Sequence, residues 1–354
     1  MSKTLEPGVV YGDSYRELLN RCKEGGYALP AVNVVGTDSV NAVMEAAAKN
    51  GSDVMIQLSN GGAQFYAGQG MEDGFQAKVL GAVSCAQHVH MLARHYGICV
   101  VLHTDHANKK LIPWVDAMID HGARHFETHG KPLFTSHMLD LSEETLEDNI
   151  SECARVLERL VPLQMSLEIE LGVTGGEEDG VGSDADLDDS ANPKLYTQPD
   201  EVLEAYNRLS PIGHFSIAAS FGNVHGVYKP GNVQLRPELL GEIQAGIASK
   251  YGTDAKPLDL VFHGGSGSTD EEIAEAVRNG VIKMNIDTDT QYAYTRSVAG
   301  SMFSGYDGVL KVDGEVGNKK AYDPRAWGKA AESAMAARVV SATQQLGSAG
   351  WSGK

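Results

Sequence analysis

The chain has 354 residues, of which 42% are hydrophobic and 21% are charged, so its composition excludes a disordered protein. A formal net charge of −18 argues against binding of nucleic acids or anionic membranes through a broadly basic face, although a single pocket can still be positive. The N-terminal segment lacks the apolar core of a signal peptide, and no apolar run approaches the roughly 18 residues that cross a membrane. The four cysteines form no CxxC pair. We expect a cytoplasmic protein that spans no membrane.

Short apolar segments alternate with amphipathic segments along most of the chain. The apolar segments predict β-strands at 28–33, 53–59, 99–106, 135–140, 166–171, 215–220, 259–263 and 281–287. The amphipathic segments predict helices at 38–50, 77–96, 111–121, 143–160, 199–209, 237–251 and 270–279. This alternation predicts an α/β fold with a parallel sheet covered by helices, closed as a (β/α)8 TIM barrel. An open, doubly wound sheet is the alternative.

The C-terminal part of the chain departs from this alternation. After residue 287 the pattern becomes irregular, and it becomes helical again at 324–346. We expect one domain over residues 1–354, with a barrel at about 27–300 and a C-terminal helical extension at about 301–354 that contributes to an oligomer contact. The last eight residues, GSAGWSGK, are expected to be loose.

Polar side chains end nearly every predicted strand, at the edge where barrel active sites lie. They are Asn33, Ser59, Asp105, His106, Asp140, Glu170, Asn223, His225, His263, Asn285 and Asp287. Three histidines, or two with a carboxylate, are the usual ligands of a catalytic zinc ion. His106, His225 and His263, with Glu170, are therefore candidate ligands. The alternative is that these histidines only form hydrogen bonds at strand ends.

Glycine-rich or polar loops follow three of the strand ends, as GNVHGVYKPG (222–231), GGSGS (264–268) and NIDTDT (285–290). Backbone N–H groups in such loops and at helix N-termini bind phosphate, and barrels often use the loops after strands seven and eight. Ordinary tight turns are the alternative. A fourth loop, 172–184, carries carboxylates between glycines, which is typical of a segment that closes over a substrate with an acid or base. A solvated acidic loop is the alternative there.

Taken together, these segments resemble the motif set of class II fructose-bisphosphate aldolases of the long-form subgroup. The matching motifs are HTDH (103–106), LEIELG (167–172) followed by TGGEEDGV, SFGNVHGVYKPGNV (220–233), FHGGSGS (262–268), KMNIDTDTQ (283–291), PAVN, QLSNGGA and YDPR (322–325). The resemblance extends, in order, from about residue 27 to about residue 340. These motifs are long, and they are far more specific than a single short glycine pattern.

The resemblance implies a reaction and a metal. The reaction is reversible aldol cleavage of fructose-1,6-bisphosphate to dihydroxyacetone phosphate and glyceraldehyde-3-phosphate, through a zinc-stabilised enediolate, in glycolysis and gluconeogenesis. His106, His225 and His263 would hold the catalytic Zn²⁺, and Glu170 would be a ligand in an alternative position. A monovalent cation, Na⁺ or K⁺, would bind nearby.

The resemblance also implies roles for the remaining site residues. Asp105 would handle the proton at the oxygen of the cleaved bond, Glu178 the proton at the carbon of dihydroxyacetone phosphate, and Asn285 would hydrogen-bond the enediolate. One phosphate would be surrounded by Gly226, Gly264, Ser266, Asp287 and Thr288. Ser59 and Arg325 would hold the other phosphate, and Asn33 would also contact substrate. Arg325 would reach in from a partner subunit of a homodimer, with a tetramer as the alternative.

Three other functions compete with this interpretation. Tagatose-1,6-bisphosphate is the nearest alternative substrate, because it differs from the fructose ester at one carbon. A metal-dependent hydrolase on the same barrel is a second alternative, since a fold does not fix a function. A non-catalytic scaffold is the third, and it would have no use for Asp105 and Glu178 together.

Overall fold

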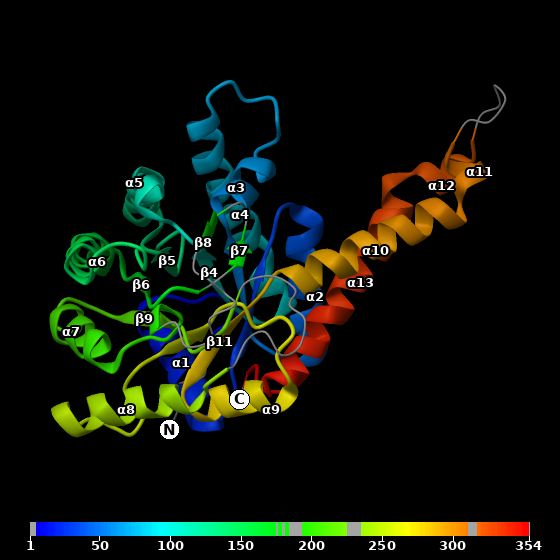
Figure 1. Ribbon diagram of the computed structural model, residues 1–354. Helices are drawn as coiled ribbons and strands as arrows, with labels where there is room; N and C mark the ends of the chain where they lie inside the picture. Colours follow the sequence, from blue (N-terminus) through cyan, green and yellow to red (C-terminus); the bar gives the residue numbers. More distant parts are fainter. Residues whose placement is uncertain are drawn as a thin grey trace.

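Parallel strands and their covering helices dominate the computed structural model shown in Figure 1. The structure describes residues 5–174, 176–178, 181–183, 193–224, 235–310 and 317–353, and only the backbone of 176–178, 181–183 and 193. No helix in this described part is long and apolar enough to cross a membrane.

Eight parallel strands of the described residues close a barrel. In ring order they are β2 (Leu29–Asn33), β3 (Val54–Leu58), β4 (Cys99–Thr104), β5 (Ser136–Leu139), β6 (Ser166–Leu171), β9 (Phe215–Ala219), β10 (Leu260–Phe262) and β11 (Val281–Ile286). The ring closes because β11 pairs with β2, with Asn285 opposite Ala31. This closure confirms the (β/α)8 prediction and excludes the open sheet.

Helices cover the outside of this barrel. They are α2 (Thr37–Asn50), α4 (Gly74–Tyr96), α5 (Ile112–His129), α6 (Leu146–Leu160), α7 (Pro199–Leu209), α8 (Glu238–Tyr251) and α9 (Asp270–Arg278). Short 3₁₀ helices lie at η1 (Lys109–Leu111), η2 (Val161–Leu163) and η3 (Pro193–Leu195). A two-stranded antiparallel hairpin, β7 (Gly176–Glu178) and β8 (Val181–Ser183), follows β6.

Two elements precede the predicted start of the barrel. Strand β1 (Gly8–Val9) pairs with β4, and helix α1 (Gly12–Gly25) follows it. Leu18 and Leu19 of α1 are buried in one cluster with inward-facing residues of the strands, such as Ala31 and Val101. Helix α1 therefore closes the amino-terminal end of the barrel, where the interior is apolar.

The carboxyl end of the barrel is polar inside and carries an additional short helix. Helix α3 (Asn60–Tyr66) directly follows β3, and the Ser59 hydroxyl caps it by accepting a hydrogen bond from Gly62 N at 3.0 Å. The cap fixes Ser59 at the end of its strand. The second half of the QLSNGGA motif is therefore helical.

A helical arm extends from the barrel and then returns to it (Figure 1). Helix α10 (Thr288–Ser304) leads outward, α11 (Tyr306–Val309) and α12 (Lys319–Tyr322) lie at the far end, and α13 (Pro324–Gln345) runs back against α10 and α2. Arg338 of α13 and Asp289 of α10 form an ion pair of 2.8 Å. This arm is the predicted C-terminal helical extension.

The prediction of a loose C-terminal tail is wrong. Gly350 N donates to Asn50 O at 3.0 Å, and Ser52 Oγ donates to Ser348 Oγ at 2.9 Å. The Trp351 ring stacks on Tyr27, with ring centroids 4.8 Å apart. These long-range contacts hold the tail against the amino-terminal end of the barrel.

Candidate active site

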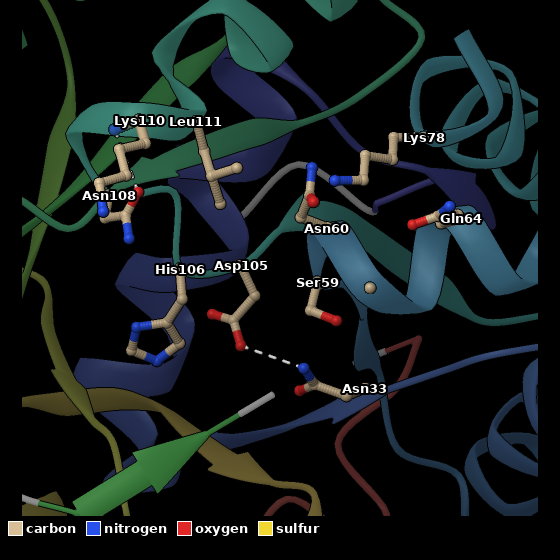
Figure 2. A pocket seen from close by; sticks show the side chains of 11 residues that line it. Asn33, Ser59, Asn60, Gln64, Lys78, Asp105, His106, Asn108, Lys110 and Leu111 are labelled. Atoms are coloured by element: carbon tan, nitrogen blue, oxygen red, sulfur yellow. Dashed lines mark hydrogen bonds between the residues drawn. The ribbon is translucent and has the colours of Figure 1, made fainter. Parts of the chain in front are cut away.

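Asp105 lies at the centre of a hydrogen-bonded group at the carboxyl ends of β2, β3, β4 and β11. Its carboxylate is fully buried and accepts hydrogen bonds from Asn33 Nδ2 (3.2 Å), Gln57 Nε2 (2.8 Å) and Asn285 Nδ2 (3.2 Å). Lys283 Nζ lies 4.0 Å from its other oxygen. Figure 2 shows the bond from Asn33. A carboxylate only accepts hydrogen bonds, so these donors fix its orientation.

His106 comes immediately after Asp105 and has an unusual backbone. Its φ of 42° lies in the left-handed region, which costs a non-glycine residue about 1–3 kcal/mol. Its Nδ1 lies 3.4 Å from Asp140 Oδ2. Burial raises the pKa of Asp140, but the contacts with His106 and then Ser142 outweigh burial and lower that pKa to about 2. The strained turn and the Asp140 contact together fix the direction of the imidazole.

His263 stands at the end of β10, across from His106. The two ring centroids are 4.6 Å apart. Its Nε2 lies 3.0 Å from Glu168 Oε1, and its Nδ1 lies 3.6 Å from Glu170 Oε2. Burial lowers the pKa of His263, but the contacts with Glu168 and Glu170 raise it to about 9. The surrounding carboxylates thus favour a positive charge at this place.

A buried ion pair between Lys283 and Glu168 contacts the site residues. Lys283 Nζ lies 2.8 Å from both carboxylate oxygens of Glu168, and both residues are almost completely buried. Burial raises the pKa of Glu168, but Lys283 and then His103 hold it well below its usual range. Burial and Lys283 lower the pKa of His103 to about 3. Glu168 therefore stays charged, and it orients the ring of His263.

The donor set at this end of the barrel fits a divalent metal ion. One donor atom each from Asp105, His106 and His263 lie within 4.8 Å of one another, as do donors from His106, Asp140 and Glu170. Glu170 Oε2 is 3.9 Å from His106 Nδ1 and 3.6 Å from His263 Nδ1, which is too long for hydrogen bonds. Imidazole nitrogen and carboxylate oxygen are usual ligands of catalytic zinc.

A pocket of about 250 Å³ opens beside these residues. Its inner wall contains Asn33, Ser59, Asp105 and His106, and Figure 2 shows these side chains together. Helices α3 and α4 and the η1 segment form the rest of the wall. A small polar molecule in this pocket would lie beside Asp105 and His106.

Comparisons with known proteins show the family of this chain. The family described as fructose-bisphosphate aldolase class-II matches residues 13–351. A curated relative, the fructose-bisphosphate aldolase class 2 of Escherichia coli strain K12, is 51% identical over 353 residues, covering 97% of this chain and 96% of the relative. The chain belongs to the class II fructose-bisphosphate aldolase family.

Two further relatives agree with this assignment. The fructose-bisphosphate aldolase of Edwardsiella ictaluri is 52% identical over 352 residues, covering 97% of this chain and 96% of that one. The crystal structure of a fructose-bisphosphate aldolase from Campylobacter jejuni superposes with a TM-score of 0.87 at 49% identity, covering 98% of both chains. This class II aldolase is thus a carbon–carbon lyase that cleaves fructose 1,6-bisphosphate, and its family is metal-dependent.

Several predicted site residues of this aldolase do lie together. The described structure brings Asp105, His106, His263, Glu170, Asn285, Asn33 and Ser59 to one end of the barrel. Of the predicted phosphate residues, Gly264 and Ser266 lie in the loop after β10, and Asp287 directly follows β11. Gly264 has a φ of 62°, a conformation that glycine adopts without strain. Thr288 is the first residue of α10.

Other predicted residues are not placed with this group. His225 and Gly226 lie outside the described residues. Glu178 belongs to β7, and its side chain lies outside the description. Arg325 stands at the start of α13 on the arm, where its side chain is 89% exposed and pairs with Asp323 at 2.8 Å. Arg325 is not among the residues that line the pocket of its own chain.

Three supporting residues escaped the sequence analysis. Gln57, Glu168 and Lys283 lie inside strands rather than at their ends. Each is a buried polar residue that faces the barrel interior. Gln57 donates a hydrogen bond to Asp105, and Lys283 forms an ion pair with Glu168. Polar residues inside a predicted strand, such as Lys283 in VIKMNI, are therefore the sequence feature that indicates these supporting residues.

Proposed function

We propose that this end of the barrel binds zinc and cleaves the C3–C4 bond of fructose 1,6-bisphosphate. His106 and His263, with His225, would hold the ion, and Glu170 would be the alternative ligand. The observation that supports this most is the convergence of two imidazoles and Glu170 beside the buried Asp105. The bound ion would act as a Lewis acid that withdraws electrons from the ketone carbonyl of the substrate.

Asp105 removes the proton from the C4 hydroxyl group in this proposal. The C3–C4 bond then breaks, its electron pair stays with the dihydroxyacetone phosphate half, and C4 becomes the aldehyde carbon. Three amide donors hold Asp105 in one orientation, which supports its use as a positioned base. The same carboxyl group returns the proton to the aldehyde oxygen in the reverse direction.

Glu178 and Asn285 complete the proton and charge balance. Glu178 delivers a proton to C3 of the dihydroxyacetone half after cleavage, and removes it in the reverse direction. Asn285 Nδ2 already lies 3.2 Å from Asp105, so the same amide is in position to bind the substrate oxygen next to C3. Charge that develops during cleavage is thereby met by fixed donors.

Two phosphate sites would hold the substrate at its ends. Gly226, Gly264, Ser266, Asp287 and Thr288 would surround the phosphate of the dihydroxyacetone half, with a Na⁺ or K⁺ ion near them. The start of α10 at Thr288 supports this, because helix N-termini attract anions. Ser59 and a partner's Arg325 would hold the second phosphate, and Asn33 would contact the sugar between them.

We also infer the oligomeric state of the enzyme, its cellular compartment and its domain organisation. Apolar side chains on the arm are exposed, including Phe303 at 82% and Tyr306 at 56%, which supports a homodimer in which the arm is covered. A tetramer is the alternative. The four cysteines are buried thiols, which supports a reducing cytoplasm. The proposed cleavage of a sugar bisphosphate supports a role in glycolysis and gluconeogenesis. The return of Trp351 to Tyr27 supports one domain over residues 1–354.

Comparison of two epimeric substrates tests the proposed specificity. The purified enzyme is assayed on fructose 1,6-bisphosphate and on tagatose 1,6-bisphosphate under the same conditions. We expect kcat/KM to be at least about tenfold higher for the fructose ester, since one reoriented hydroxyl group leaves a buried donor or acceptor unpaired. Higher kcat/KM on the tagatose ester would contradict the proposal. Release of inorganic phosphate in place of carbon–carbon cleavage would favour a hydrolase.

A further inference from the structure

Two lysines line the pocket on the side away from the buried site residues. Lys78 belongs to α4, and Lys110 belongs to η1. Figure 2 shows them on opposite sides of the pocket, beyond Asp105 and Ser59 in this view, with the Lys78 side chain directed toward Asn60. Asp105 and the two lysines therefore line the same pocket.

Neither ammonium group is neutralised by the described part of the chain. In that part, no carboxylate lies within ion-pair distance of Lys78 or Lys110. Their neighbour Lys109 behaves differently, because its Nζ lies 2.7 Å from Glu144 Oε2. In a protein with a net charge of −18, two lysines that line one pocket without carboxylate partners are a local excess of positive charge.

The backbone holds both lysines in place. Trp114 Nε1 donates a hydrogen bond to the Lys78 carbonyl oxygen at 3.1 Å, which links α5 to α4 at this position. The Lys110 amide donates to Asn108 Oδ1 at 3.1 Å. Asn60 supplies a third donor, because its Nδ2 is buried and has no hydrogen-bond partner among the described residues. The pocket is thus lined by two charged donor groups, from Lys78 and Lys110, and by one neutral donor, from Asn60.

We propose that Lys78 and Lys110, with Asn60, bind the phosphate of the aldehyde half of the substrate, in addition to Ser59 and the partner's Arg325. This inference rests on the proposed function. In that function Asp105 acts at the C4 oxygen, so C5, C6 and the second phosphate extend from Asp105 into this pocket. The loops after β10 and β11, which would hold the other phosphate, contribute no residue to the pocket. Lys78 and Lys110 therefore distinguish phosphorylated aldehydes from unphosphorylated ones.

The condensation reaction tests this directly, because each of its two substrates carries one phosphate. KM is measured for glyceraldehyde 3-phosphate and for dihydroxyacetone phosphate in the wild type and in Lys78→Met. We expect the variant to raise KM for glyceraldehyde 3-phosphate about tenfold, since a charge-assisted hydrogen bond is lost. KM for dihydroxyacetone phosphate should change less than about twofold. Lys110→Met should act in the same direction.

Two further variants separate binding from folding. Lys78→Arg keeps the charge and should recover most of the affinity for glyceraldehyde 3-phosphate. Lys109→Met is the matched control, because that lysine is adjacent to Lys110 but is paired with Glu144. It should leave both KM values unchanged. Thermal unfolding and zinc content of each variant establish that the fold and the metal are intact.

Failure of the proposed function and failure of the lysine site give different results in this assay. If the wild type does not condense the two substrates, the proposed function fails. If the wild type condenses them but Lys78→Met and the double variant with Lys110→Met keep both KM values, only the lysine site is wrong. An equal rise of both KM values would also overturn it, because it would indicate a general disturbance of the site.

Discussion

Asp105 is the residue on which the proposed proton transfer depends. Asp105→Asn keeps the size and most hydrogen bonds of the side chain but removes its ability to accept a proton. We expect kcat for fructose 1,6-bisphosphate to fall about 10²–10⁴-fold, which is the usual contribution of a positioned general base. Zinc bound per protomer, measured by atomic emission, should stay at the wild-type value.

The geometry makes zinc content the decisive control. Asp105 has a donor atom within 4.8 Å of donors on His106 and His263, so it could instead hold the ion. A parallel loss of zinc and activity in Asp105→Asn would assign it as a ligand and remove the base role. Asn33→Ala provides a useful comparison, since it removes one hydrogen bond to Asp105 and leaves the carboxylate.

Site residues at strand ends could be predicted from the sequence, whereas the buried residues that hold them in place could not. His106, His263 and Asp105 were found because apolar strands stop at polar residues, and those ends meet at one edge of a parallel barrel. Lys283 and Glu168 were missed because their pairing joins strands that are far apart in sequence. The direction of the His106 ring depends on a positive φ, which the local sequence does not predict.

At the scale of elements, the contact between α3 and α4 controls the position of Ser59. A Cβ atom added at Gly81 of α4 would lie 1.7 Å from Ala63 O of α3. Alanine normally stabilises a helix by up to about 1 kcal/mol relative to glycine. Here we expect Gly81→Ala to lower the free energy of unfolding by about 2 kcal/mol, because α3 must move. KM for fructose 1,6-bisphosphate should rise, since Ser59 moves with α3.

Gly74→Ala is the matched control for this prediction. Gly74 lies in the same helix, but the nearest atom to its added Cβ would be Gln64 Nε2 at 3.7 Å. We expect Gly74→Ala to be neutral or stabilising in chemical denaturation. Equal stability of the two variants would show that the α3–α4 contact is not tight and that Ser59 is held by other means.

The elements that sequence analysis missed have physical reasons for being difficult. Helix α3 contains two adjacent glycines, which have low helix propensity, and it is held by its Ser59 cap and by packing on α4. Helix α10 has no clear apolar face in its sequence, although it packs against α13 within the arm. Helix α1 did carry a signal, since Tyr15, Leu18, Leu19 and Cys22 share one buried face.

At the scale of the whole molecule, the arm carries Arg325 away from the pocket of its own chain. If Arg325 serves the partner's site, two inactive variants should complement each other. Arg325→Met and Asp105→Asn are co-expressed with different tags, and the heterodimer is purified through both. We expect it to regain roughly half of the wild-type kcat/KM, because one of its two symmetric sites has both residues.

The alternative arrangement gives a different result for the same heterodimer. If Arg325 served its own chain, neither site of the heterodimer would hold both residues, and no activity would return. Phe303→Lys provides an independent check of the dimer, because it places a charge on the exposed apolar arm. Sedimentation should then show a shift toward monomer, and a chain that sediments as a monomer without this substitution would contradict the arm interface.

The shape of the arm and the anchored tail could not be predicted from local patterns. Contacts such as Asn50 with Thr343 and Asp53 with Ser352 join residues about three hundred positions apart. Small polar residues such as those in GSAGWSGK form loose ends in most proteins. Here their backbone groups bond to the α2–β3 turn, and only the folded barrel supplies those partners.

The central claim, metal-assisted cleavage of fructose 1,6-bisphosphate, is tested most directly by one assay. Cleavage is measured in the untreated enzyme, after complete removal of metal with a chelator, and after zinc is added back. The proposed site predicts that activity disappears with the metal and returns with zinc in proportion to the zinc bound at one ion per protomer. Cleavage that continues in protein shown to be free of metal would contradict it, and trapping by borohydride would then identify the lysine that forms an imine with the substrate.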